Sequence, residues 1–201
     1  MHPGFSIAGL SLSPTRIPAR EAVSTVNEIF EREAMPHMPD IFRTAQRLLE
    51  DRARAEDVTQ ETFLQAWKSF HKFEPGTNCR AWLFKILFHC VNHHRRKLFR
   101  FRLLNETEEF LEENLTAPQP IPGQLSDADV VRALDEIPAD FRSVVLLVDV
   151  EEFPYKEAAN ILEIPIGTVM SRLSRGRRLL RDKLKDVARS YGIAAGGQEQ
   201  K

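Results

Sequence analysis

The sequence lacks the features that mark secreted and membrane-spanning proteins. It has only two cysteines, Cys79 and Cys90, in 201 residues, too few for a disulfide framework. No apolar run approaches the roughly 18 residues of a membrane-spanning helix, and the N-terminal residues lack the basic start and apolar core of a secretory signal. We therefore expect a protein of a reducing cytoplasm that makes no membrane contact of its own.

The sequence also lacks a convincing strand, because its apolar residues recur at helical spacing. It contains no internal repeat either. The ambiguous segment is "SVVLLVDV", which has strand propensity, but Phe141, Val144, Val145 and Val148 around it have helical spacing. We interpret it as a helix and predict an all-α fold. The first predicted helix covers residues 21–34, and the second starts near Asp40, which caps it, and ends before a break at residues 50–56. The other predicted helices cover residues 57–70, 80–100, 127–136, 141–150, 154–163 and 167–186.

Proline divides this helical chain into two parts. Residues 117–124 hold three prolines and a glycine, a density that neither a helix nor a strand interior tolerates. Ser126 follows as a good N-cap for the next helix. The predicted organisation is a flexible tail over residues 1–20, a helical domain over 21–103, a linker over 104–125, a second helical domain over 126–190 and a flexible tail over 191–201.

Positive and negative charges are segregated along the sequence, although 28 Lys and Arg nearly balance 29 Asp and Glu in number. Residues 79–104 contain seven basic residues and no acid, and residues 166–185 contain seven basic residues against one acid, Asp182. Between these segments, residues 103–131 contain glutamates but no Lys or Arg. This pattern favours two contact surfaces for a polyanion, and solvated helix faces are the alternative for each.

The segment "YKEAANILEIPIGTVMSRLSRGRRLL" has the form of a helix-turn-helix. Small residues at Ala158 and Ala159 allow close packing, Pro165 lies in the turn, and Thr168 is placed to cap the second helix. That helix points Val169 and Leu173 inward and leaves serine and arginine side chains available to a major groove and its phosphates. The alternative is a helical hairpin with a solvated basic face.

Two motifs now give a specific resemblance. The segment "RARAEDVTQETFLQAWKSFHKFEPGTNCRAWLFKIL" resembles the second domain of the extracytoplasmic-function (ECF) sigma factors of the bacterial sigma-70 family. The segment "LDEIPADFRSVVLLVDVEEFPYKEAANILEIPIGTVMSRLSRGRRLLRDKL" resembles their fourth domain, so that the likeness covers about Ile29 to Val187. It implies a non-enzymatic factor without cofactor, which binds core RNA polymerase and directs transcription from promoter DNA.

The resemblance places polymerase binding on the helix beginning "AEDVTQETFLQAW". Its polar stripe would contact the clamp coiled coil of the largest polymerase subunit, while Phe63 and Trp67 face inward. The expected contact residues are Asp57, Gln60, Glu61 and Gln65.

The loop "KFEPGTNC" is, by the same resemblance, the reader of the minus-ten promoter element as melted single-stranded DNA. Asn78 is the expected base contact, because an amide reads the edge of a flipped base; the alternative is that it only caps the following helix. Trp82 is either a stacking platform or a core residue. The expected minus-ten residues are Asn78, Thr77, Arg80, Lys85, Asn92, Arg95, Arg96 and Lys97.

The second helix of the helix-turn-helix would read the minus-thirty-five element in the major groove. The expected contacts are Thr168, Ser171, Arg172, Arg175, Arg177 and Arg178. Two residues depart from the family pattern. Met170 stands where many relatives carry arginine. Glu163 stands where many carry glycine, and a left-handed conformation there would cost glutamate about 1 kcal/mol.

Other interpretations remain open at this point. His89 and His93 lie four residues apart, as two metal ligands on one helix do, but nothing nearby completes a tetrahedral set and the helix is basic. A helix-turn-helix regulator that acts without polymerase is the second rival. The resemblance further implies an anti-sigma factor as a partner, and an acidic linker that either threads toward the polymerase active-site channel or is a disordered spacer.

Overall fold

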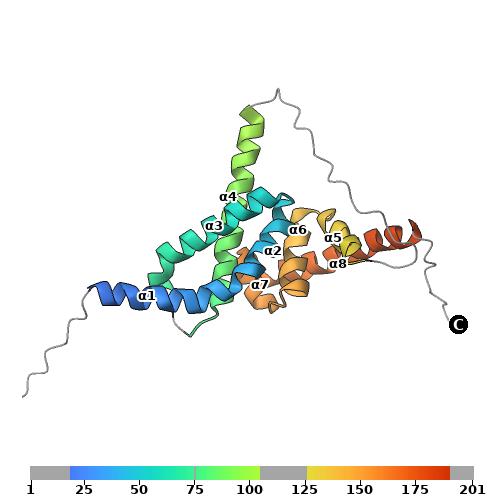
Figure 1. The fold of residues 1–201 in the computed structure, drawn as a ribbon. Coiled ribbons are helices and arrows are strands. Elements are labelled where there is room, and N and C mark those ends of the chain that lie inside the picture. Colours follow the sequence, from blue (N-terminus) through green and yellow to red (C-terminus); the bar gives the residue numbers. More distant parts are fainter. Residues whose placement is uncertain (1–18, 75, 105–125, 191–201) are drawn as a thin grey trace, which may run out of the picture.

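The structure is a computed structural model that describes residues 19–74, 76–104 and 126–190 (Figure 1). Every regular element in these ranges is helical, which confirms the all-α prediction. None of the described helices has the length and apolar character needed to cross a membrane. The expected tails and nearly all of the acidic linker lie outside the described residues.

Four helices form an N-terminal bundle: α1 (Ala19–Ala34), α2 (Met38–Leu49), α3 (Arg52–Ser69) and α4 (Cys79–Leu104). Short 3-10 turns precede α2 (η1, Met35–His37) and follow α3 (η2, Phe70–Lys72). The bundle buries Ile41, Val58, Leu83, Leu87 and Val91 completely. Their helical spacing explains the predicted pattern, because each apolar face turns to one shared core.

Three details of this bundle differ from the sequence predictions. Asp40 does not cap α2, which begins two residues earlier with Pro39 in its first turn, a position that suits proline. The break after α2 involves only Glu50 and Asp51, because the Asp51 side chain caps α3 by accepting a hydrogen bond from the Arg54 amide at 3.0 Å. Trp67 is 38% exposed, although its ring makes a T-shaped contact with Phe30, with ring centroids 5.1 Å apart.

The C-terminal bundle contains α5 (Asp127–Asp135), α6 (Ala139–Val145), α7 (Tyr155–Leu162) and α8 (Ile166–Ser190). A π-helical turn, η3 (Leu146–Val150), continues α6. The predicted cap is confirmed, because Ser126 and Asp129 form a reciprocal capping box at the start of α5. The ambiguous segment is helical as predicted. Its run of consecutive apolar residues looks like a strand because the helix is buried on every side at Val144–Leu147.

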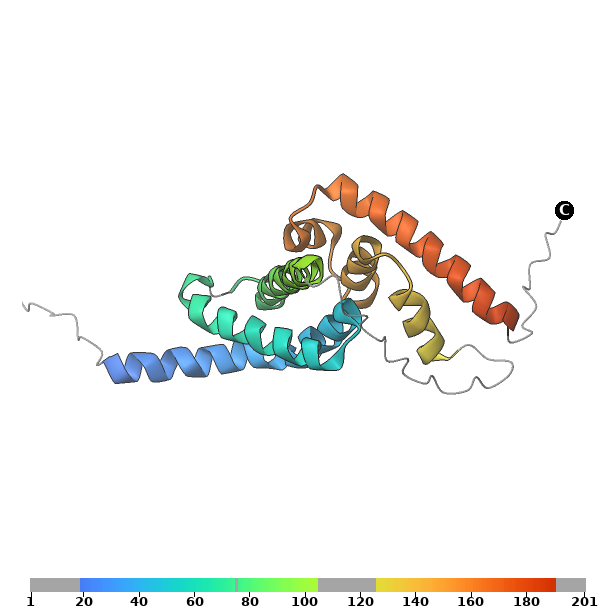
Figure 2. The same ribbon diagram turned by 90° about the horizontal axis from the view of Figure 1, so that it is seen from above.

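The two bundles pack against each other side by side. Helix α7 lies against α4, and α2 lies beside α6, as the two views in Figures 1 and 2 show. Helix α8 runs along the outer side of the C-terminal bundle, where it packs against α6 and α5. The segments that carry the two basic stretches, α4 and α8, are thereby separated by the small helix α7.

Gly176 fixes how closely α8 approaches α6. A Cβ atom at this position would lie 2.7 Å from the Val145 Cγ2 atom, inside van der Waals contact. We expect Gly176→Ala to lower the free energy of unfolding by about 1–2 kcal/mol, because overpacking outweighs the gain of about 1 kcal/mol in helix propensity. Thermal unfolding followed by circular dichroism measures this change.

Gly167 supplies the matched control on the same helix. No atom lies within 4 Å of a Cβ built there, so Gly167→Ala is expected to raise the unfolding temperature. Equal effects of the two substitutions would contradict the close α6–α8 crossing.

Candidate nucleic-acid interface

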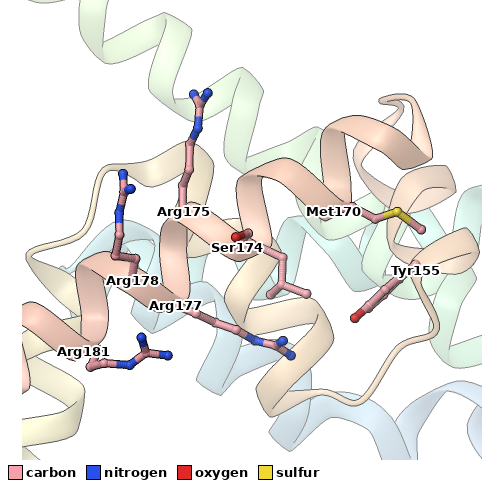
Figure 3. A pocket seen from close by; sticks show the side chains of 8 residues that line it. Tyr155, Met170, Ser174, Arg175, Arg177, Arg178 and Arg181 are labelled. Carbon is pink, nitrogen blue, oxygen red and sulfur yellow. The ribbon is translucent and has the colours of Figure 1, made fainter.

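Helix α8 presents one polar stripe to solvent. Thr168, Ser171, Arg175 and Arg178 follow one another at helical spacing, and all but the half-buried Thr168 are exposed. Figure 3 shows Arg175 and Arg178 pointing to the same side of the helix. Neither has an ion pair within the part of the chain that the structure describes. Opposite this stripe, Val169 and Leu173 are buried as predicted, which fixes the helix on the bundle.

Two of the predicted arginines are held by carboxylates of their own bundle. Arg172 is half-buried and pairs with Asp140 of α6 at 2.8 Å. Arg177 makes a two-pronged pair with Asp149 of η3, at 3.0 and 2.6 Å. These guanidinium groups therefore orient α8 against α6 and η3, whereas Arg175 and Arg178 are available to an external anion.

A hollow of about 440 Å³ lies beside the stripe. Its walls include Met170, Ser174, Arg181 and Tyr155, of which only Met170 drew attention in the sequence (Figure 3). Met170 is 48% exposed and offers an apolar surface there. Ser174 and Arg181 follow Met170 by four and eleven residues, a spacing that places all three on the same face of α8.

The turn between α7 and α8 confirms one prediction and corrects another. Glu163 is left-handed, with φ of 55°, and the Ile164 amide donates to the Ala159 carbonyl at 3.1 Å. Thr168 does not cap α8, because the helix begins at Ile166 and the Pro165 carbonyl accepts hydrogen bonds from the amides of Thr168 and Val169.

The loop before α4 is a tight turn closed by its own side chains. Gly76 adopts φ of 88°, and the Thr77 hydroxyl donates to the Glu74 carbonyl at 2.7 Å. The Asn78 Oδ1 atom accepts a hydrogen bond from the Ala81 amide at 3.1 Å, so Asn78 caps α4. Its amide nitrogen is left to act as a donor, and here it donates to the Glu157 carboxylate of α7 at 2.9 Å.

The basic residues of α4 fall into three groups. Arg80 and Lys85 face the C-terminal bundle and pair with Glu151 and Glu163 respectively. Arg95 faces inward and donates to the Leu48 carbonyl at the end of α2, at 2.6 Å, and burial lowers its pKa. Arg96 and Lys97 are exposed. The structure thus does not gather the predicted phosphate contacts on one open face.

A groove of about 340 Å³ runs between α4 and α7. On α4 it is lined by Trp82, Asn92, His89 and His93, and on α7 by Leu162 among others. Trp82 is half-buried, with its ring against Phe70 and Phe73, so it combines core packing with an exposed edge.

The predicted polymerase contacts on α3 occupy two neighbouring stripes. Asp57 and Gln60 are exposed, whereas Glu61 and Gln65 are both half-buried, and the Gln65 amide donates to the Glu61 carboxylate at 3.0 Å. Leu64 extends the first stripe and is 52% exposed. Sequence reasoning missed it, although its spacing of four residues from Gln60 placed it on that face.

The cysteines and histidines do not assemble a metal centre in the described ranges, where no three His, Cys, Asp or Glu side chains lie close enough to share an ion. Cys90 is fully buried beside Thr62, and burial raises its pKa to about 11. Burial likewise raises the pKa of Cys79 to about 11. Both thiols are therefore kept protonated, which opposes metal ligation.

Comparison with known proteins identifies the two bundles. A helix-turn-helix bundle with an exposed arginine stripe, joined to a second helical bundle, defines a class of DNA-binding transcription protein. The family description "Sigma-70 region 2" matches residues 34–100, and "Sigma-70, region 4" matches residues 127–180. The chain belongs to the sigma-70 family as an ECF RNA polymerase sigma factor, a transcription initiation factor and not an enzyme.

Individual relatives agree with this assignment. The ECF RNA polymerase sigma factor SigE of Mycolicibacterium smegmatis is 36% identical over 153 residues, which cover 74% of this chain and 58% of SigE. EcfG of Rhodopseudomonas palustris is 34% identical over 140 residues, covering 69% of this chain and 76% of EcfG. Among solved structures, the complex of the sigma factor RpoE with the anti-sigma factor NepR from Bartonella quintana matches with a TM-score of 0.66 and 32% identity, over 79% of this chain and 98% of that one.

The buried thiols give a direct test of the region around Cys90. At pH 8 a thiol with a pKa of about 11 is only ~0.1% thiolate. We expect both cysteines of the native protein to react with a disulfide reagent at least ~100-fold more slowly than free cysteine, and at the free rate in denaturant. Rapid reaction of one thiol in the native protein would contradict the packing of α4.

Proposed function

We propose that this sigma factor reads the minus-thirty-five element with α8 and the minus-ten element with the loop before α4. The observation that carries the first half is the exposed stripe of Ser171, Arg175 and Arg178 on a helix whose opposite face is buried. Such a helix fits the major groove, where arginine donates to guanine and serine to several bases. Arg172 and Arg177 act there as positioning residues while their carboxylate partners hold them.

The minus-ten half is supported by the two-sided use of the Asn78 amide. Its oxygen caps α4, and its nitrogen is a donor that is occupied here by a carboxylate oxygen. A base edge presents acceptors of the same kind. We propose that a flipped base takes the place of Glu157, and that Thr77, Arg80, Lys85, Asn92, Arg96 and Lys97 surround the adjoining strand.

Core polymerase would bind the exposed stripe of α3. Asp57 and Gln60 precede an exposed apolar side chain, Leu64, on the same stripe of α3. Exposed apolar side chains beside polar ones are typical of protein interfaces. The site is open in this structure, so polymerase binding needs no rearrangement of α3.

An anti-sigma factor is the further partner we propose. RpoE of Bartonella quintana is bound by the anti-sigma factor NepR in the co-crystal structure that this chain resembles. We extend that type of partner to this chain, and we propose the cytoplasm as its location, where polymerase and chromosome are found.

Run-off transcription with purified core polymerase tests the function. Genomic fragments from the same cells serve as templates, since the promoter sequence is unknown. A transcript with a defined start that requires this protein is the expected result. Binding to duplex DNA without such a transcript would instead favour a helix-turn-helix regulator that acts without polymerase.

The two uses of Asn78 are separable by substitution. Asn78→Asp keeps a capping oxygen but loses the amide donor, so we expect unchanged thermal stability and at least ~10-fold less transcript. Asn78→Ala removes both and should also lower stability by about 1 kcal/mol. If Asn78→Asp transcribes like the native protein, the residue is a helix cap only.

A further inference from the structure

Met170 is an exposed apolar side chain on the helix that we propose to read the minus-thirty-five element. It is 48% exposed and lies in the second turn of α8, next to Ser171. The core does not need it, because Val169 and Leu173 fill the buried face of the same turns. Single exposed apolar residues are common on protein surfaces. This one, however, stands among polar side chains on the part of α8 that the proposed function places in the major groove.

Helical geometry places Met170 beside the exposed stripe of α8 and not behind it. Met170, Ser174 and Arg181 share one face, which adjoins that stripe because successive residues of a helix are turned by about 100°. Met170 lines the same hollow as Arg175, Arg178 and Arg181 (Figure 3). Its apolar surface is thus next to guanidinium groups that suit phosphates and guanine.

The first turn of α8 leaves room for DNA to come close on this side. Gly167 has no side chain, and no atom lies within 4 Å of a Cβ built there. It precedes Ser171 by one turn of the helix. In a helix-turn-helix, the N-terminal residues of the second helix contact base edges. With no side chain at Gly167, the start of α8 can approach the bases, and Met170 has the length to reach the floor of the groove.

The four bases differ in what they offer an apolar side chain in the major groove. Only thymine has a methyl group there, whereas guanine, cytosine and adenine present hydrogen-bonding groups. A methionine that covers one of those polar groups removes its water without replacing the hydrogen bond, which weakens binding. Covering the thymine methyl group instead takes apolar surface out of water. Both effects favour thymine under a methionine side chain.

We propose that Met170 is a specificity-determining residue of the minus-thirty-five site, where it selects an A·T pair by contact with the C5-methyl group of the thymine. The proposal rests on the function proposed above for α8, and it adds the identity of one base pair of the element. Arg175 and Arg178 contact the adjoining pairs and phosphates through their own donors. The element therefore contains a thymine under Met170, on one strand or the other.

Base preference is measured with holoenzyme assembled from core polymerase and the full-length protein. The template is a promoter found in the run-off assay, with its minus-thirty-five region randomised, and the bound DNA is recovered and sequenced. We expect the native protein to enrich an A·T pair at one position. Met170→Arg should change this position alone to G·C, by about 10-fold, because arginine donates to guanine.

Val130→Arg is the matched control for the added charge. Val130 is 41% exposed on α5, outside the hollow, and its replacement changes an apolar side chain to the same basic one. It should leave every base preference unchanged, because an added positive charge alone strengthens binding to any sequence.

The methyl contact is tested by a change in the DNA alone. Deoxyuridine in place of thymidine at the selected position removes the C5-methyl group and keeps every hydrogen-bonding group. We expect the native holoenzyme to prefer thymidine by about 4-fold in competition binding, as one buried methyl-sized group predicts. Met170→Ala, which shortens the side chain and suits a helix, should lose this preference. Ile166→Ala, which truncates an exposed apolar neighbour one turn earlier, should keep it.

Unchanged base preferences in Met170→Arg overturn the proposal, and so does equal binding of the thymidine and deoxyuridine promoters by the native holoenzyme. A uniform loss of transcript in Met170→Arg without a change in base preference assigns Met170 to a protein contact and also overturns it. Failure of the proposed function is distinct from these results. In that case the native protein gives no transcript with a defined start, or its holoenzyme shows no base preference anywhere in the randomised region.

Discussion

The arrangement of the whole molecule depends on one buried carboxylate, that of Glu151. Taking a carboxylate out of water costs several kcal/mol unless charges and hydrogen bonds replace its hydration. All of its side-chain replacements, Arg80 and Thr44, come from the other bundle. Its backbone position is in turn fixed by the π-helical turn η3, because the Glu151 amide donates to the Leu146 carbonyl at 2.9 Å. The ionised side chain is therefore satisfied only while the two bundles are together.

The chemistry of this contact would let one set of side chains bind both the carboxylates seen here and the DNA proposed above. Guanidinium, ammonium and amide groups bind carboxylates and phosphates by the same kinds of hydrogen bond. The contact combines charged pairs with apolar packing, and the net free energy of such buried pairs is small, since solvation of the separated groups offsets their attraction. Phe153, which packs against Phe84 of α4, is one of its apolar elements. The directional hydrogen bonds of the charged pairs make such an interface specific in geometry.

Most of the fold followed from the sequence, because it depends on local signals. Ser126, the prolines and helical apolar spacing indicated the helices, and Val169 and Leu173 faced the core as expected. Trp67 was misjudged because spacing gives the direction of a side chain but not how far the next helix covers it. The contact of Arg80 with Glu151 spans 71 residues and has no periodic signal, so single-sequence reasoning could not find it. The same holds for Leu48 as the partner of Arg95.

The groove between α4 and α7 has walls from both bundles, with Trp82 and Asn92 on one side and Leu162 on the other. A site assembled in this way exists only while the bundles are closed. Any molecule that contacts both walls must bind the closed form more tightly than the open one. If DNA binds only the open form, such a molecule would inhibit DNA binding without sharing any contact residue with the DNA.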